Sequence, residues 1–105
     1  MISFVLSHGR GGKASAFEGG VRVNAFVGGG FVPESARGST PVGLSAICDV
    51  YTTFCALGGA DPFDSVGDAN GLPPVDGVDL WSWIVGDTES SPRSEVPIGA
   101  TVCTD

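Results

Sequence analysis

Glycine and proline are the residues that most restrict how this chain can fold. The sequence holds 17 glycines and 7 prolines among 105 residues, about 23 % of the chain against a norm near 12 %. Both residue types interrupt helices and strands. We therefore expect few long elements, many turns and a chain that folds poorly by itself.

The rest of the composition is that of a chain with a core. Hydrophobic residues make up 42 % and charged residues 16 %, and the mean hydropathy is +0.25, which excludes a disordered chain. The length allows at most one ordinary domain, or a piece of a larger one. No stretch approaches the roughly 20 apolar residues of a membrane span, and the apolar start lacks the features of a signal peptide.

Charge is divided unevenly along the sequence. The net charge is −7, yet residues 1–37 carry +2 and the remaining 68 residues carry −9. This balance argues against nucleic acid or an anionic membrane surface as a general partner. An anionic ligand is favoured only in the N-terminal third, which contains Arg10, Lys13 and Arg22.

Hydrophobic spacing predicts an α/β fold with few strands. Apolar or alternating runs indicate strands at 2–6, 21–27 and 95–102. Pro97 favours a sheet edge for the last of them. Strands alternating with helices in this order are typical of an α/β arrangement.

Helical spacing occurs between these strands. Apolar residues three and four apart predict one main amphipathic helix over residues 44–57, ended by Gly58 and Gly59. A short helix is expected near 78–85. Residues 60–75 have no periodicity and are expected to form a long loop.

The cysteines do not form a metal-binding pattern. Cys48, Cys55 and Cys103 contain no Cys-x-x-Cys pair and have no histidine at ligand spacing, so zinc is not expected. Cys48 and Cys55 are seven residues apart in the predicted helix, roughly 10 Å on one face, which is too far for a disulfide. Buried thiols are the favoured interpretation, with a disulfide-held domain as the alternative and the redox compartment left open.

Three glycine-containing segments form a longer pattern. The first reads R-G-G-K at 10–13 and F-E-G-G-V-R at 17–22. The second reads C-D-V-Y-T-T-F-C-A-L-G-G-A-D-P at 48–62. The third reads L-P-P-V-D-G-V-D-L-W at 72–81, followed by S-P-R-S-E at 91–95. In residues, order and spacing they resemble the sulfatase family, and its arylsulfatase branch in particular.

The resemblance implies that residues 1–105 are a fragment from the later part of an alkaline-phosphatase-like α/β catalytic domain. It implies hydrolysis of sulfate esters, with a sulfated small molecule or glycan as ligand. In that family the nucleophile is a formylglycine made in a C/S-x-P/A-x-R motif, and calcium is held by Asp and Asn side chains. This sequence contains no such motif, and no Asp or Asn precedes Asn24. We therefore expect this chain alone to hold no calcium and to be inactive.

The resemblance also assigns residues to the sulfate site. It places the ammonium group of Lys13 against the sulfate, while Gly11 and Gly12 let the backbone pass close to the ligand. His8, the single histidine, is interpreted either as a leaving-group acid or sulfate contact beside Lys13, or as an exposed turn residue.

Acidic residues near these motifs have two interpretations each. Glu18 either orients the segment that contains Lys13 or forms an ion pair with Arg22. A carboxylate cluster is one interpretation of Asp49, Asp76 and Asp79. Capping and turn roles are favoured, because the resemblance places these residues in segments that serve packing and helix capping in the family.

A second interpretation keeps the scaffold and omits catalysis. The chain would then be a non-catalytic, sulfatase-derived module that binds sulfated ligands at the basic N-terminal stretch. Family members are often secreted or lysosomal, and the sequence leaves the compartment open.

Overall fold

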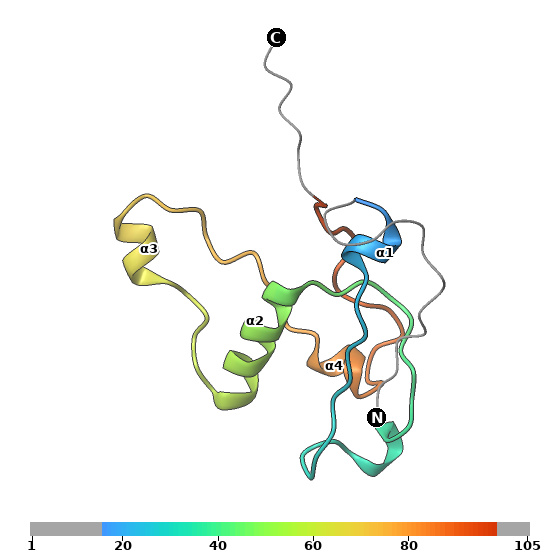
Figure 1. Ribbon diagram of the computed structural model, residues 1–105. Coiled ribbons are helices and arrows are strands. Elements are labelled where there is room, and N and C mark those ends of the chain that lie inside the picture. Colours follow the sequence, from blue (N-terminus) through green and yellow to red (C-terminus); the bar gives the residue numbers. More distant parts are fainter. Residues whose placement is uncertain (1–15, 99–105) are drawn as a thin grey trace. The chain divides into compact units, whose positions relative to one another are not determined.

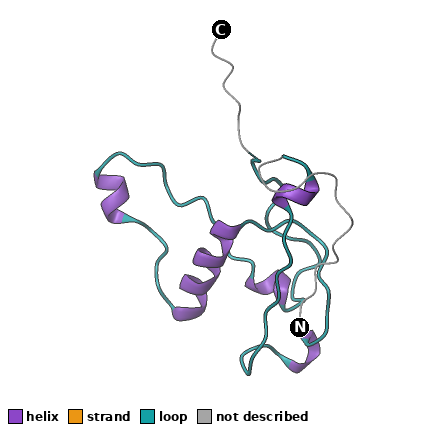
Figure 2. Ribbon diagram, in the orientation of Figure 1, coloured by secondary structure: helices purple, strands orange, loops and turns teal. Residues whose placement is uncertain are grey.

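Helices are the regular elements of residues 16–98, the part of the chain that the computed structural model describes (Figures 1 and 2). In chain order they are α1 (Glu18–Val21), the 3-10 helix η1 (Glu34–Ala36), α2 (Ile47–Gly58), α3 (Ser65–Ala69) and α4 (Trp81–Ile84). The chain divides into a terminal unit, residues 1–41 with 95–105, and a helical unit, residues 42–94. No described helix is long and apolar enough to cross a membrane.

The expected α/β fold is wrong for the described residues, none of which forms a β-strand. Residues 21–27 begin at the end of α1 and continue without strand pairing, and Val23 and Phe26 are 74 % and 76 % exposed. Residues 95–98 form no strand either. An alternating run becomes a stable strand only when neighbouring strands or a packed layer support it. The strand expected at 2–6 lies outside the described residues.

The main predicted helix is present as α2. It was expected over 44–57 and begins slightly later, where the Asp49 carboxylate accepts the Ala46 N–H at 2.7 Å. It ends at Gly58 and is capped by Gly59, whose φ of 67° lies in the left-handed region that glycine adopts without strain. Local sequence signals therefore determine both ends of this helix.

The orientation of α2 reverses the usual arrangement of an amphipathic helix, which buries its apolar side. The buried positions of α2 are Asp49, Thr52 and Thr53. The exposed apolar positions are Ile47 at 88 %, Phe54 at 66 %, Tyr51 at 51 % and Val50 at 42 %. The polar face of α2 is thus the one that packs within the helical unit.

A short helix, α3, lies inside the segment expected to be a loop. Its N-cap is Asp64, whose Oδ1 accepts the N–H groups of Val66 at 3.1 Å and Gly67 at 2.9 Å. Such a cap stabilises the first turn by satisfying amides that have no partner within the helix. The expectation of one long loop over residues 60–75 is therefore wrong for Ser65–Ala69, which are helical.

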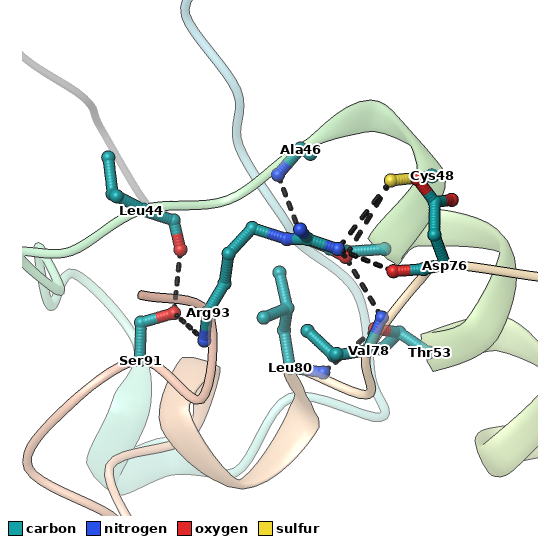
Figure 3. Close-up of polar contacts among 10 residues, drawn as sticks. Leu44, Ala46, Cys48, Thr53, Asp76, Val78, Leu80, Ser91 and Arg93 are labelled. Atoms are coloured by element: carbon teal, nitrogen blue, oxygen red, sulfur yellow. Dashed lines mark hydrogen bonds and ion pairs between the residues drawn. The ribbon is translucent and has the colours of Figure 1, made fainter. Parts of the chain in front are cut away.

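The apolar core of the helical unit is small and centres on α4. Leu80 and Trp83 are its buried hydrophobic residues. The chain passes close to the Trp83 ring at Gly43, where an added Cβ would lie 2.9 Å from the ring and 2.9 Å from Cβ of Ser91. The Ser91 hydroxyl also donates to the Leu44 carbonyl at 2.6 Å (Figure 3). These contacts join the two ends of the unit.

In the terminal unit, the buried hydrophobic residues of the described part lie in and beside η1. Val32 and Ala36 are buried there. Arg37 Nε donates to the Val32 carbonyl at 3.1 Å, and the Ser39 hydroxyl donates to the Ala36 carbonyl at 2.7 Å. Side chains thus satisfy backbone carbonyls that have no strand or helix partner.

Candidate functional site

Most of the residues predicted for a sulfate site lie outside the described part of the chain. These residues are His8, Gly11, Gly12 and Lys13. Glu18, the first residue of α1, is described, and its Oε2 lies 2.8 Å from Arg22 Nη1. Both side chains are about half exposed. The ion-pair interpretation of Glu18 is therefore confirmed.

The main charged centre of the described residues is an ion pair between Asp49 in α2 and Arg93. Figure 3 shows Arg93 with its neighbours Ala46, Cys48 and Asp76. Arg93 Nη2 donates to Asp49 Oδ1 at 2.5 Å, and Arg93 Nε donates to Oδ2 at 2.7 Å. The Asp49 side chain is fully buried and that of Arg93 is 10 % exposed. Two parallel bonds of this kind fix the guanidinium plane as well as its position.

Backbone amides complete the coordination of the Asp49 carboxylate. The Ala46 N–H donates to Oδ2 at 2.7 Å, and the Val78 N–H donates to Oδ1 at 2.9 Å. Burial by itself disfavours the charged carboxyl, but the hydrogen bonds from Arg93, Ala46 and Val78 outweigh it, so the pKa of Asp49 lies below its ordinary value. In turn, the carboxylate raises the pKa of the Arg93 guanidinium. The pair is therefore charged at neutral pH.

The polar face of α2 binds an irregular segment of backbone. The N–H of Val78 donates to Asp49, and the N–H of Leu80 donates to Thr53 Oγ1 at 3.0 Å. The donors are two residues apart in the segment and the acceptors four apart in the helix. Side chains one helical turn apart in α2 thus accept from alternate backbone amides of the segment.

Close packing at Gly77 holds this segment against the helix. An added Cβ there would overlap Thr52 Oγ1 and lie 2.5 Å from the Cys48 carbonyl oxygen. Thr52 Oγ1 is buried and has no hydrogen-bond partner within the described residues. Glycine is thus required at this position by lack of space.

The predicted roles of Asp49 and Asp79 in capping and turns are confirmed. Asp49 accepts the amide that precedes α2, and Asp79 Oδ1 accepts the Trp81 N–H at 2.8 Å at the start of α4. Asp76 contributes its backbone carbonyl, which accepts from Arg93 Nη2 at 2.8 Å. The described part of the chain holds no group of three His, Cys, Asp or Glu side chains arranged to bind a metal ion.

Cys48 lies at the edge of the charged centre, with its sulfur 3.7 Å from Arg93 Nη2. Burial, followed by the charges of Asp49 and Asp76, raises the pKa of its thiol. Cys48 and Cys55 are both free and only half buried. The buried thiols predicted for α2 are thus partly accessible, and Cys103 lies outside the described residues.

Sequence reasoning did not identify Arg93 as the partner of Asp49. The two residues are 44 positions apart, so no local pattern joins them. One signal was present: Arg93 is the only basic residue after residue 37. A carboxylate in a buried helix face requires a cation or several donors, and Arg93 is the only basic side chain in residues 42–94.

Comparisons with protein-family models, with curated proteins and with solved structures found no match to this chain.

Proposed function

We propose that this chain is a sulfatase-type segment that binds a sulfate ester through Lys13 and belongs to the machinery of sulfuric ester hydrolysis. The proposal rests on the three motif segments and on one structural observation. The second and third segments resemble separate parts of the sulfatase pattern, and the Asp49–Arg93 ion pair joins them. A pattern whose distant parts contact each other is better supported than one read from order alone.

The contacts within the helical unit support a division of roles between the motifs. Asp49 accepts from Arg93 and from the Val78 amide, and Thr53 accepts from the Leu80 amide. They therefore build the scaffold and are not groups that would bind a ligand. This leaves the first motif, in the cationic part of the sequence, for the sulfate.

Lys13 is the proposed sulfate contact. An ammonium group about 4 Å from a sulfate oxygen contributes from about 1 kcal/mol in water to about 4 kcal/mol near a protein surface. Gly11 and Gly12 carry no Cβ, so no side chain at these two positions would keep the backbone away from the anion. Glu18 is held by Arg22, which removes it as a competing anion for Lys13.

The residues of this sequence do not fit the calcium ion and formylglycine of the family. No Asp or Asn precedes Asn24, and no C/S-x-P/A-x-R motif is present. A nucleophile for sulfur and a cation for the sulfate oxygens would have to come from outside this sequence. We therefore propose binding of the sulfate ester by the 105-residue chain, without turnover.

The test is a titration of the purified chain with an aryl sulfate, followed by ligand-observed NMR. The parent phenol, which lacks the sulfate, is the ligand control. Lys13→Ala should abolish saturable binding, while Arg37→Gln, which removes an equal charge from the N-terminal third and leaves the Glu18–Arg22 ion pair in place, should retain it. Equal binding by Lys13→Ala and the unaltered chain would contradict the proposal.

Turnover distinguishes the remaining possibilities. Release of the phenol by the purified chain, abolished by Lys13→Ala, would show that the chain is a complete enzyme and overturn the expected inactivity. Binding of a sulfated glycan such as heparin in preference to the aryl sulfate, weakening with salt, would favour the non-catalytic binding module.

A further inference from the structure

The exposed side of α2 has the composition of a protein-binding surface. Ile47, Val50, Tyr51 and Phe54 follow one another at helical spacing, and each is at least 42 % exposed. We call these four residues the apolar stripe. Single exposed hydrophobic residues are ordinary, but a row of them along one helix marks an interaction site.

Acidic residues lie beside the apolar stripe. The Tyr51 hydroxyl donates to the Pro62 carbonyl at 3.5 Å, which places the segment between α2 and α3 next to the stripe. That segment carries Asp61 and Asp64, both exposed. Their charges, after the effect of Cys55, contribute to raising the pKa of Tyr51. The stripe is thus flanked by negative charge.

The helical unit as a whole is strongly acidic. Residues 42–94 contain eight acidic side chains and one basic side chain. That base, Arg93, is bonded to the buried Asp49, and the other seven acids are all exposed. The unit therefore presents a negative field that attracts cations and repels another acidic surface.

We propose that the apolar stripe of α2 is a docking surface for a basic amphipathic helix of another polypeptide. Residues spaced three and four apart on one helix pack against the same spacing on a second helix. Lysine or arginine residues flanking the partner's apolar side would meet Asp61 and Asp64. A second copy of this chain fits less well, because it would bring two acidic units together.

The experiment uses the full 105-residue chain and a fluorescent helical peptide made of Leu and Lys, with Leu at the spacing of the stripe. Two control peptides are a scrambled Leu/Lys sequence and a helical Leu/Glu peptide. Fluorescence anisotropy should show saturable binding of the Leu/Lys helix only. The binding should weaken with added salt, because exposed charges are screened.

Variants locate the binding on the chain. Phe54→Ser should weaken it about tenfold or more, the effect of losing a large aromatic contact. Val42→Ser, at a position 87 % exposed and outside α2, should leave it unchanged. Both side chains are exposed, so neither substitution removes a core contact, and circular dichroism checks that the helices remain.

The acidic flank is tested by the double substitution Asp61→Asn with Asp64→Asn. Asparagine can still accept the capping hydrogen bonds that Asp64 accepts from the Val66 and Gly67 amides of α3, so the substitution removes only charge. Affinity should fall about fivefold, as for two exposed ion pairs. The matched control is Asp87→Asn with Glu89→Gln, which removes the same charge elsewhere and should have a smaller effect.

Three results would overturn the proposal. One is equal binding of the Leu/Glu or scrambled peptide. Another is a loss in Phe54→Ser no larger than in Val42→Ser. The third is a dimer in sedimentation experiments that Phe54→Ser dissociates, which would make a second copy the occupant of the stripe.

Discussion

Replacing Arg93 by methionine should destabilise the helical unit more than any surface substitution. Methionine keeps much of the length of the side chain and removes its charge and donors. The Asp49 carboxylate would remain buried with the Ala46 and Val78 amides and the weakly donating Cys48 thiol as its donors. A buried charge without its counter-ion is the costliest defect that one substitution can create here.

The size of the effect follows from the burial of the pair. Because the Asp49 side chain is fully buried and that of Arg93 is 10 % exposed, solvent screens the interaction weakly. Removing one partner of such a pair costs about 3–5 kcal/mol. Proteins have about 0.05–0.15 kcal/mol of stability per residue, so residues 42–94 have about 3–8 kcal/mol in total. Arg93→Met should therefore leave the unit marginal or unfolded at 25 °C.

Urea unfolding followed by tryptophan fluorescence measures this loss directly. Both tryptophans of the sequence, Trp81 and Trp83, lie in the helical unit, so the signal reports that unit alone. Asp87→Asn, an exposed position, is the control and should change the free energy of unfolding by less than about 0.5 kcal/mol.

The double variant Asp49→Asn with Arg93→Met separates the ion pair from its packing. Asparagine can still accept an amide hydrogen bond and carries no charge, so the double variant should be more stable than Arg93→Met alone. A loss below about 1 kcal/mol in Arg93→Met, the range of exposed pairs, would refute the argument that this ion pair holds the unit together.

Three further predictions concern the same unit. Folding lowers the pKa of Asp49, so its contribution to stability is complete above the pKa of the unfolded chain, about 3.9, and is lost as the pH falls through the lowered pKa. Fluorescence-detected unfolding at a series of pH values should show this loss, and Asp49→Asn should make the stability depend less on pH. Gly77→Ala should cost about 1–3 kcal/mol because its Cβ would overlap Thr52, whereas Gly58→Ala, with open space at its Cβ, should be neutral or stabilising in the same urea experiment. The raised pKa of Cys48 should slow its reaction with a thiol reagent relative to the urea-unfolded chain. Mass spectrometry of the labelled peptide measures the rate, and an equal rate in both states would contradict the raised pKa.

The parts of the fold that could be predicted are those with local causes. Helical spacing and a left-handed glycine at 59 define α2, and Gly86 follows α4 with a φ of 85°. The strand predicted at 21–27 required partners that a local pattern cannot supply. α3 was missed because it has only five residues, too few for a periodicity, although Asp64 followed by Ser65 was a capping signal.

Only the contacts between residues close in sequence could be predicted for the candidate site. Capping by Asp49 and Asp79 follows from their positions just inside or before a helix. The ion pair of Asp49 with Arg93 and the bond of Leu80 to Thr53 span 44 and 27 positions. Contacts at that separation depend on how the chain is folded, and one sequence does not contain that information in any local pattern.

The high glycine and proline content explains why α2 buries its polar face and exposes its apolar face. In a unit whose described residues form no strand, the amides of the irregular segment before α4 need acceptors, because unpaired buried N–H groups are costly. The polar face of α2 supplies them, with Asp49 accepting from Val78 and Thr53 from Leu80. Turning this face inward brings the apolar stripe outward. The same shortage of regular backbone pairing that makes the chain loop-rich therefore produces the surface to which we assign a partner.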